Sequence, residues 1–157
     1  MRIITSTDLS DEQEDILFDA PLKDVVLITG PPGSGKTVMA FLRAQALSKK
    51  FDIVSLIMYN KVLSKFSENG AQNNNRIDVR TMHSWVWRWW KGICRSVRIP
   101  EIQKWSYDWK KMFEILLNKK VDGSLDIDKV NWSHIILDEG QDFNKAMYEF
   151  FNQTRVA

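Results

Sequence analysis

The sequence holds 157 residues with a formal net charge of +2, and its 44% hydrophobic and 27% charged residues are typical of one globular domain. No apolar run approaches the roughly 20 residues that a membrane-spanning helix needs, and the first residues lack the layout of a secretion signal. We therefore expect no association with a membrane. The single cysteine, Cys94, excludes an internal disulfide and favours a cytoplasmic protein.

Predicted helices and strands alternate along the first half of the chain. A capping-box pattern starts at Ser10, with Gln13 three residues later, and Pro21 lies just past the helix that this pattern predicts. Short apolar runs rich in β-branched residues predict strands that are buried on both faces. After the first helix we expect a strand at 25–29, a helix at 36–49, a strand at 52–59, a helix at 61–68, a polar loop at 70–75 and a strand at 76–79.

The second half of the chain begins with a long helical pattern. It covers residues 81–117, is rich in tryptophan and is interrupted near Pro100. A loop at 121–128 then precedes a strand at 133–137, and Asn144 is placed to cap a last helix. Because strands alternate with helices, we predict an α/β fold with a mainly parallel sheet.

Positive charge and tryptophan are concentrated in one segment. Between Arg80 and Lys111 there are eight lysines or arginines, two acidic residues and six of the seven tryptophans. We interpret residues 81–120 as a basic helical insertion within a single domain that covers residues 1–157. Cations mixed with aromatic rings suit a single-stranded nucleic acid, although large aromatics are more often core residues. We expect most tryptophans to pack inside and the following cations to face outward: Arg88, Lys91, Arg95 and Arg98.

The octapeptide GPPGSGKT, residues 30–37, fits the phosphate-loop pattern G-x-x-x-x-G-K-[ST] between a predicted strand and a predicted helix. Glycines let successive N–H groups point at phosphate oxygens, and the helix N-terminus adds partial positive charge. Lys36 would reach the β- and γ-phosphates, and the Thr37 hydroxyl would bind Mg²⁺. The alternative is a plain turn joining a strand to a helix. We predict an ATP and Mg²⁺ site formed by Gly30, Pro31, Pro32, Gly33, Ser34, Gly35, Lys36 and Thr37.

A second chemical feature is the stretch HIILDEGQDF, residues 134–143, in which an apolar strand ends in two adjacent carboxylates. In phosphate-loop proteins an acidic residue at such a strand end helps to hold the metal, and Asp138 suits that role. Glu139 is placed to orient or deprotonate the water that attacks the γ-phosphate. The alternative is a solvated strand end without chemical function.

Five stretches, in this order, resemble the UvrD/Rep-like superfamily 1 helicases. They are LSDEQEDIL at 9–17, GPPGSGKT at 30–37, YNKVLSKF at 59–66, RTMHSW at 80–85 and ILDEGQDF at 136–143. The resemblance implies a RecA-like P-loop NTPase, a three-layer sandwich that forms an incomplete first lobe with a short helical insertion.

The resemblance also implies roles for individual residues. Gln13 would read adenine, Arg43 would lie near the nucleotide, and Gln141 would join Lys36 and Glu139 in catalysis by coupling the γ-phosphate to DNA contacts. Single-stranded DNA would contact Tyr59, Asn60, Thr81 and His83. Plain alternatives stand beside these roles: Gln13 as the partner in a capping box, Tyr59–Asn60 as a strand-to-helix junction, and His83 as a core histidine.

Three interpretations of the whole chain follow. The first is the N-terminal ATPase lobe of a UvrD-like DNA helicase, expected to hydrolyse ATP weakly without a second lobe or protein partner supplied in trans. The second is a naturally short, non-motor module that binds nucleotide or DNA or docks on a partner. The third is a small P-loop kinase or other NTPase. The arrangement Asp-Glu-x-Gln-Asp speaks against the third.

Overall fold

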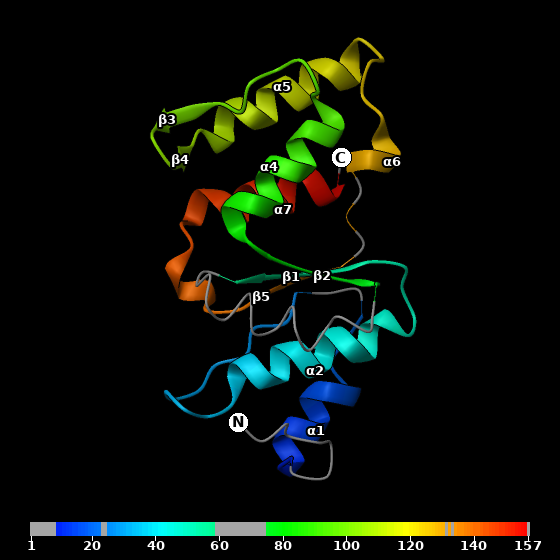
Figure 1. Ribbon diagram of the computed structural model, residues 1–157, viewed down its shortest axis with the longest axis vertical. Helices are drawn as coiled ribbons and strands as arrows, with labels where there is room; N and C mark the ends of the chain where they lie inside the picture. Colours follow the sequence, from blue (N-terminus) through cyan, green and yellow to red (C-terminus); the bar gives the residue numbers. More distant parts are fainter. Residues whose placement is uncertain (1–8, 23–24, 59–74, 131, 133, 157) are drawn as a thin grey trace.

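The computed structural model describes residues 9–22, 25–58, 75–130, 132 and 134–156. A three-stranded sheet lies between two layers of helices (Figure 1). The elements are α1 (Asp11–Phe18), α2 (Lys36–Ser48), β1 (Val54–Met58), β2 (Ile77–Thr81), α4 (Met82–Ile93), β3 (Glu101–Gln103), β4 (Ser106–Tyr107), α5 (Trp109–Val121), α6 (Ile127–Val130), β5 (His134–Leu137), the 3₁₀ turn η2 (Gly140–Asp142) and α7 (Lys145–Val156). The helix predicted at 61–68 lies outside the described residues.

The sheet has the strand order β2-β1-β5, and both pairings are parallel. Val54 of β1 is opposite Ile77 on one side and opposite His134 on the other. Every residue of the central strand β1 is buried, which fits a parallel strand covered on both faces. The predicted α/β fold with a parallel sheet is confirmed, and the carboxyl ends of the three strands meet at one edge.

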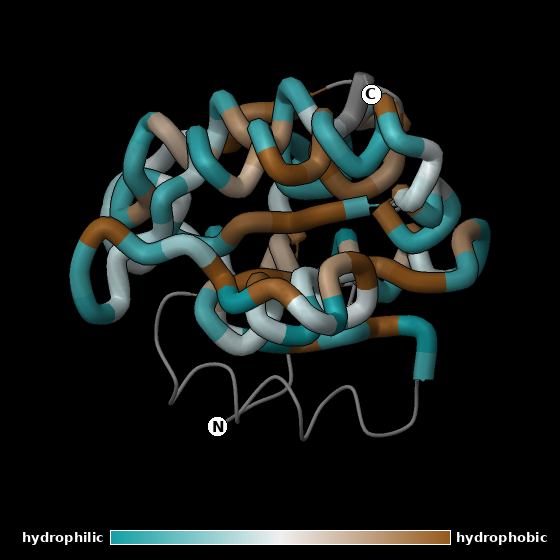
Figure 2. Tube along the Cα trace, turned by 90° about the horizontal axis from the view of Figure 1, so that it is seen from above, coloured by the Kyte–Doolittle hydropathy of each residue, from teal (hydrophilic) through white to brown (hydrophobic). Residues whose placement is uncertain are grey.

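Each face of the sheet has its own core. Leu56 and Met58 of β1 pack toward α2, whereas Ile57 packs on the opposite face, against the layer formed by α4, α5 and α7. Successive side chains of a strand point to opposite faces, so one strand supplies both cores. Figure 2 shows hydrophilic and hydrophobic stretches alternating along the outer helices, as expected when one face of a helix meets the sheet.

The tryptophans divide as the sequence suggested. Trp85, Trp90 and Trp109 are buried, while Trp87 and Trp105 are more than half exposed. The four cations expected at the surface are all exposed: Arg88, Lys91, Arg95 and Arg98. Among the described residues no helix is both long enough and apolar enough to cross a membrane.

Two sequence predictions need correction. The apolar run 25–29 belongs to no strand, and Val25 and Leu27 are each 84% exposed. A strand requires a hydrogen-bonded neighbour, and among the described residues β5 pairs only with β1. The second correction concerns the interruption near Pro100, where the antiparallel hairpin β3–β4 replaces helix. Proline has no N–H to donate and stops a helix, but nothing local announces strand pairing over so few residues.

The exposed run supports a direct test by paired leucine variants. Leu27→Ala is expected to change the free energy of unfolding by no more than about 0.5 kcal/mol, because Leu27 is 84% exposed. Leu56→Ala should cost about 2–5 kcal/mol, because Leu56 is fully buried and its loss leaves a cavity. Urea unfolding of both variants measures the difference. A cost of 2 kcal/mol or more for Leu27→Ala would restore the buried strand that the sequence indicated.

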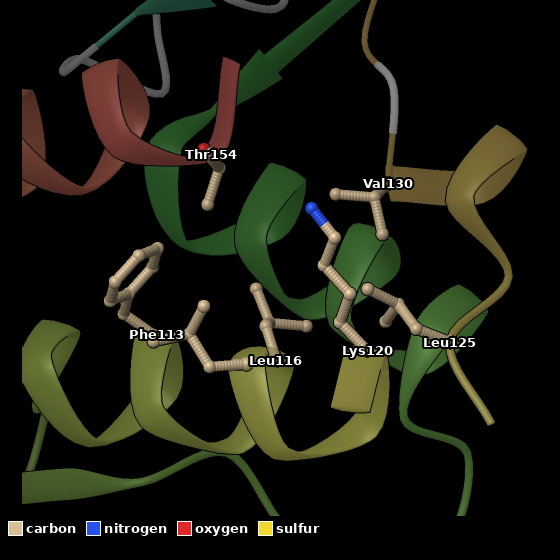
Figure 3. Close-up of a pocket in the computed structure, with 7 residues that line it drawn as sticks. Phe113, Leu116, Lys120, Leu125, Val130 and Thr154 are labelled. Atoms are coloured by element: carbon tan, nitrogen blue, oxygen red, sulfur yellow. The ribbon is translucent and has the colours of Figure 1, made fainter. Parts of the chain in front are cut away.

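A small cavity of about 20 Å³ lies between α5, α6 and α7 (Figure 3). Its lining residues are Phe113, Leu116, Leu117, Lys120, Leu125, Val130 and Thr154. This volume is about that of one water molecule, far below the roughly 300–1,000 Å³ of a substrate pocket. We therefore regard the cavity as imperfect packing between α5, α6 and α7.

Candidate nucleotide site

The phosphate loop joins the apolar segment that ends before Gly30 to the start of α2. Gly33 and Gly35 have φ values of 80° and 83°, a left-handed conformation that glycine adopts without strain. Gly35 is the residue that precedes α2, so the loop leads straight into a helix N-terminus. A Cβ atom on Gly30 would lie 2.8 Å from Ser34 Oγ, so the Ser34 side chain would have to rotate away. The loop therefore has the curled backbone that a phosphate group requires.

Lys36 is folded into this loop. Its Nζ donates hydrogen bonds to the carbonyl oxygens of Gly30 and Pro31, each at 3.0 Å. The loop closes on itself through a further bond from Ser34 N to Pro31 O at 3.2 Å. The ammonium group is thus held at the centre of the curl by neutral carbonyls, which a phosphate oxygen can replace with a stronger, charge-assisted bond.

The two motifs predicted from the sequence meet at the end of β5. Thr37 Oγ1 donates to Asp138 Oδ1 at 3.2 Å, across 101 residues of sequence. Asp138 N in turn donates to Ile57 O at 2.9 Å, which fixes this carboxylate at the carboxyl edge of the sheet. The strand register, together with α2, therefore brings the hydroxyl and the carboxylate together.

Asp138 has the properties of a cation ligand. Its side chain is only 4% exposed, and its Oδ2 atom is buried without a hydrogen-bond partner in the described part of the chain. Burial raises the pKa of Asp138, and the charge of Glu139 raises it further, whereas the hydrogen bond from Thr37 lowers it. Mg²⁺ prefers oxygen ligands and takes one or two from protein beside phosphates and water. Thr37 and Asp138 fit that requirement.

Glu139 lies in a strained turn directly after Asp138. Its φ of 54° and ψ of 48° are left-handed, which is uncommon for a residue other than glycine and is often found at functional sites. Gln141 Nε2 donates to Glu139 Oε2 at 2.7 Å, so the amide orients the carboxylate. The two residues assigned to catalysis and to γ-phosphate sensing are therefore in direct contact.

Gln13 is in contact with the same loop. Its backbone N–H and side-chain oxygen complete the capping box with Ser10, which confirms that local prediction. Its Nε2 also donates to Ser34 O at 3.3 Å. The capping role and a position beside the phosphate loop are therefore compatible, because the oxygen of the amide serves one and the nitrogen the other.

A family model described as AAA domain matches residues 13–156, which is nearly the whole chain. The chain belongs to the AAA domain family. A nucleotide-binding P-loop domain of this kind agrees with the glycine conformations, the helix N-terminus and the Thr37–Asp138 contact. Comparison with curated proteins found no match, and comparison with solved structures found none either.

In this AAA domain Arg43 has a structural role that the sequence did not suggest. Its guanidinium donates to Leu17 O and Ala20 O, which ties the end of α1 to the middle of α2. Burial lowers the pKa of Arg43. The arginine helps to hold α1, and with it Gln13, against the phosphate loop; its expected proximity to the nucleotide stays a prediction.

One residue of the site was missed at the sequence level. Tyr148 of α7 donates from its hydroxyl to Gly140 O at 2.6 Å, directly after Glu139. A Cβ atom on Gly140 would lie 2.8 Å from that hydroxyl oxygen. Tyr148 therefore positions the turn that carries Glu139. No motif marked it, because a tyrosine in an amphipathic helix is indistinguishable from packing until the helix is docked.

The residues predicted to contact DNA are only partly described. Tyr59 and Asn60 lie outside the described residues. Thr81 Oγ1 accepts a hydrogen bond from Ser84 N and so caps α4. His83, in the first turn of α4, is half-buried, and its ring packs against Trp105 and Tyr107 of the hairpin region. Their contact with DNA stays a prediction.

Proposed function

We propose that this AAA domain is the ATP- and Mg²⁺-binding N-terminal lobe of a UvrD-like DNA helicase, in which ATP hydrolysis is coupled to single-stranded DNA. The observation that carries the proposal is the hydrogen bond from Thr37 to Asp138, whose other oxygen is buried without a partner in the described residues. A carboxylate kept in that state favours a divalent cation, and a cation beside a phosphate loop favours a nucleoside triphosphate.

Each residue then has a definite task. Lys36 exchanges its two carbonyl partners for phosphate oxygens, and the N–H groups at the start of α2 face the same anion. Thr37 and Asp138 hold the cation. When bound, Mg²⁺ neutralises charge on the phosphates. Glu139 accepts the proton of the attacking water, and Gln141 positions its carboxylate.

The coupling to DNA rests on the same turn. Gln141 contacts Glu139, and Tyr148 holds the turn at residues 139–142 through Gly140. A change at the γ-phosphate would therefore shift this whole turn. The DNA partner is supported by the order of the five helicase-like stretches and by the exposed cations around α4. A further lobe or protein in trans would complete the motor.

We expect nucleotide to change the affinity of the chain for single-stranded DNA. Coupling of the usual strength of about 1–3 kcal/mol would shift the dissociation constant roughly 5- to 150-fold. Anisotropy of a labelled oligonucleotide, with and without Mg²⁺ and a non-hydrolysable ATP analogue, measures the shift. Gln141→Ala should bind the analogue normally and lose most of the shift, because it leaves Glu139 without its amide partner. An oligonucleotide affinity that is insensitive to the analogue would exclude the coupling.

A further inference from the structure

Trp105 is held in a costly conformation at the surface. It lies in the turn between β3 and β4, with a φ of 68° and 65% of the residue exposed. A left-handed conformation costs a bulky residue stability, and leaving a large apolar ring in water adds no compensating burial. Together with Glu139, it is one of the two positive-φ residues other than glycine in the described part of the chain. Strained residues of this kind cluster at binding and catalytic sites.

The exposed ring is also fixed in position. Trp105 meets His83 edge-to-face with 5.5 Å between the ring centroids, and His83 packs on Tyr107 in the same way at 5.2 Å. The hydroxyl of Tyr107 donates to His83 O at 3.5 Å. Burial, with a smaller contribution from Glu101, raises the pKa of Tyr107 to about 12, so this phenol remains a donor. The three rings thus tie the hairpin to the first turn of α4.

We propose that Trp105 is a stacking site for a base of single-stranded nucleic acid, with the neighbouring Lys104 meeting the backbone phosphate. This inference rests on the proposed function and adds to it a residue that no motif includes. Base stacking on an aromatic ring needs an exposed, immobilised face, and the His83 contact leaves Trp105 mostly open to solvent. Lys104 is exposed and has no ion pair in the described part of the chain.

The charge around the hairpin favours nucleic acid over an apolar protein partner. The segment from Arg80 to Lys111 carries eight basic residues against Glu101 and Asp108. Two of the eight, Arg80 and Arg88, form ion pairs with Asp78, which leaves six basic residues against two acidic ones. The hairpin belongs to the layer of α4 and α5, away from α1 and α2 (Figure 1). A strand of nucleic acid crossing the start of α4 would therefore meet Trp105 and the basic surface together.

Trp87 offers a matched control. It is 52% exposed, like Trp105, but it lies within α4 and its ring is covered by the ammonium of Lys91, 4.3 Å from the centroid. A ring already engaged by a cation on its face is a poorer surface for a base. The two exposed tryptophans therefore separate stacking from a general loss of an aromatic residue.

The test is the affinity for a fluorescein-labelled oligothymidine of about 15 nucleotides, a length within reach of single-strand binding sites. Trp105→Asn should weaken binding roughly 5- to 150-fold, the range expected when one stacked base is lost. Asparagine tolerates a left-handed φ, so the thermal midpoint of this variant should equal or exceed that of the wild type. Trp105→Tyr should keep most of the affinity, and Trp87→Ala should stay within about twofold.

The outcomes separate this inference from the proposed function. Unchanged oligothymidine affinity in Trp105→Asn, with a folded protein, would overturn the stacking site and leave the helicase-lobe proposal intact. Equal losses of oligothymidine affinity in Trp105→Asn and Trp87→Ala would also overturn the stacking site. The loss would then follow from removing any exposed tryptophan. Wild-type protein that binds no oligothymidine would overturn both. Stacking at Trp105 with no response to the ATP analogue would uphold this site and refute the coupling alone.

Discussion

Lys36→Ala is expected to abolish most nucleotide binding, with a loss of affinity of roughly 30- to 4,000-fold. Losing one member of a desolvated, hydrogen-bonded charge pair costs about 2–5 kcal/mol, and each 1.4 kcal/mol is tenfold in affinity. The fold should survive, because the bonds of Lys36 in the described part of the chain go to two loop carbonyls, and alanine is a good helix former at the start of α2. Titration with a fluorescent ATP analogue in the presence of Mg²⁺ measures the loss.

Lys50→Ala provides the control for charge. Lys50 is exposed just beyond the other end of α2, about 20 Å away at 1.5 Å per residue, which is well past the screening length in physiological salt. The variant Lys50→Ala loses the same charge as Lys36→Ala, and it should bind the ATP analogue as tightly as the wild type does. If Lys36→Ala bound the analogue as tightly as the wild type, the assignment of residues 30–37 as the phosphate site would be wrong.

Asp138→Asn is expected to act in opposite directions on stability and on function. Without Mg²⁺ the variant should be more stable than the wild type at neutral pH, by an amount on the order of 1 kcal/mol. A neutral amide costs less free energy to bury than a carboxylate whose Oδ2 atom has no partner among the described residues. With Mg²⁺ it should lose the part of ATP affinity that depends on the metal, since the amide is a weak ligand for a hard cation.

The stability difference has a definite pH dependence. Burial raises the pKa of Asp138 in the folded chain above the ordinary value of an aspartate. Folding therefore favours the protonated form, and the wild type loses stability as the pH rises from the ordinary pKa through the raised one. Asparagine does not titrate, so the advantage of Asp138→Asn should grow across that window and stay constant above it.

Thermal unfolding in metal-free buffer over a pH series measures this advantage. Asp142→Asn serves as the control, because Asp142 is exposed in the same turn and its replacement removes the same formal charge. A variant Asp138→Asn that is less stable than the wild type at neutral pH would mean that the carboxylate is needed for folding. If the wild type bound ATP equally well with and without Mg²⁺, the assignment of a metal site to Thr37 and Asp138 would be wrong.

Much of the site could be predicted because its residues lie in short motifs that are local in sequence. The loop from Gly30 to Thr37 needs only glycines, a lysine and a following helix, and all of these lie within one stretch of sequence. The capping box at Ser10 is equally local, and it forms as expected. The position of Asp138 beside the phosphate loop was also expected, because an acidic residue at a strand end lies beside that loop in phosphate-loop proteins.

Other features depend on which elements become neighbours. Tyr148 reaches Gly140 only after α7 has docked against the sheet, and no spacing rule joins the two residues. The aromatic contact between Trp105 and His83 likewise joins the hairpin β3–β4 to a helix that precedes it in sequence. Arg43 matched a position expected near the nucleotide, yet its guanidinium is bound by two carbonyls at the end of α1.

The run at 25–29 shows the limit most clearly. Its β-branched and aliphatic residues favour an extended backbone. Yet none of residues 25–29 is assigned to a strand. Whether extended residues are also a buried strand depends on a hydrogen-bonded neighbour, which lies elsewhere in the chain. Residue types alone therefore indicated the phosphate loop and the α/β class of the fold. Only the packed structure decided which apolar segment joins the sheet, because strand pairing is a non-local interaction. The docking of elements likewise placed Tyr148 beside the site and left Trp105 at the surface.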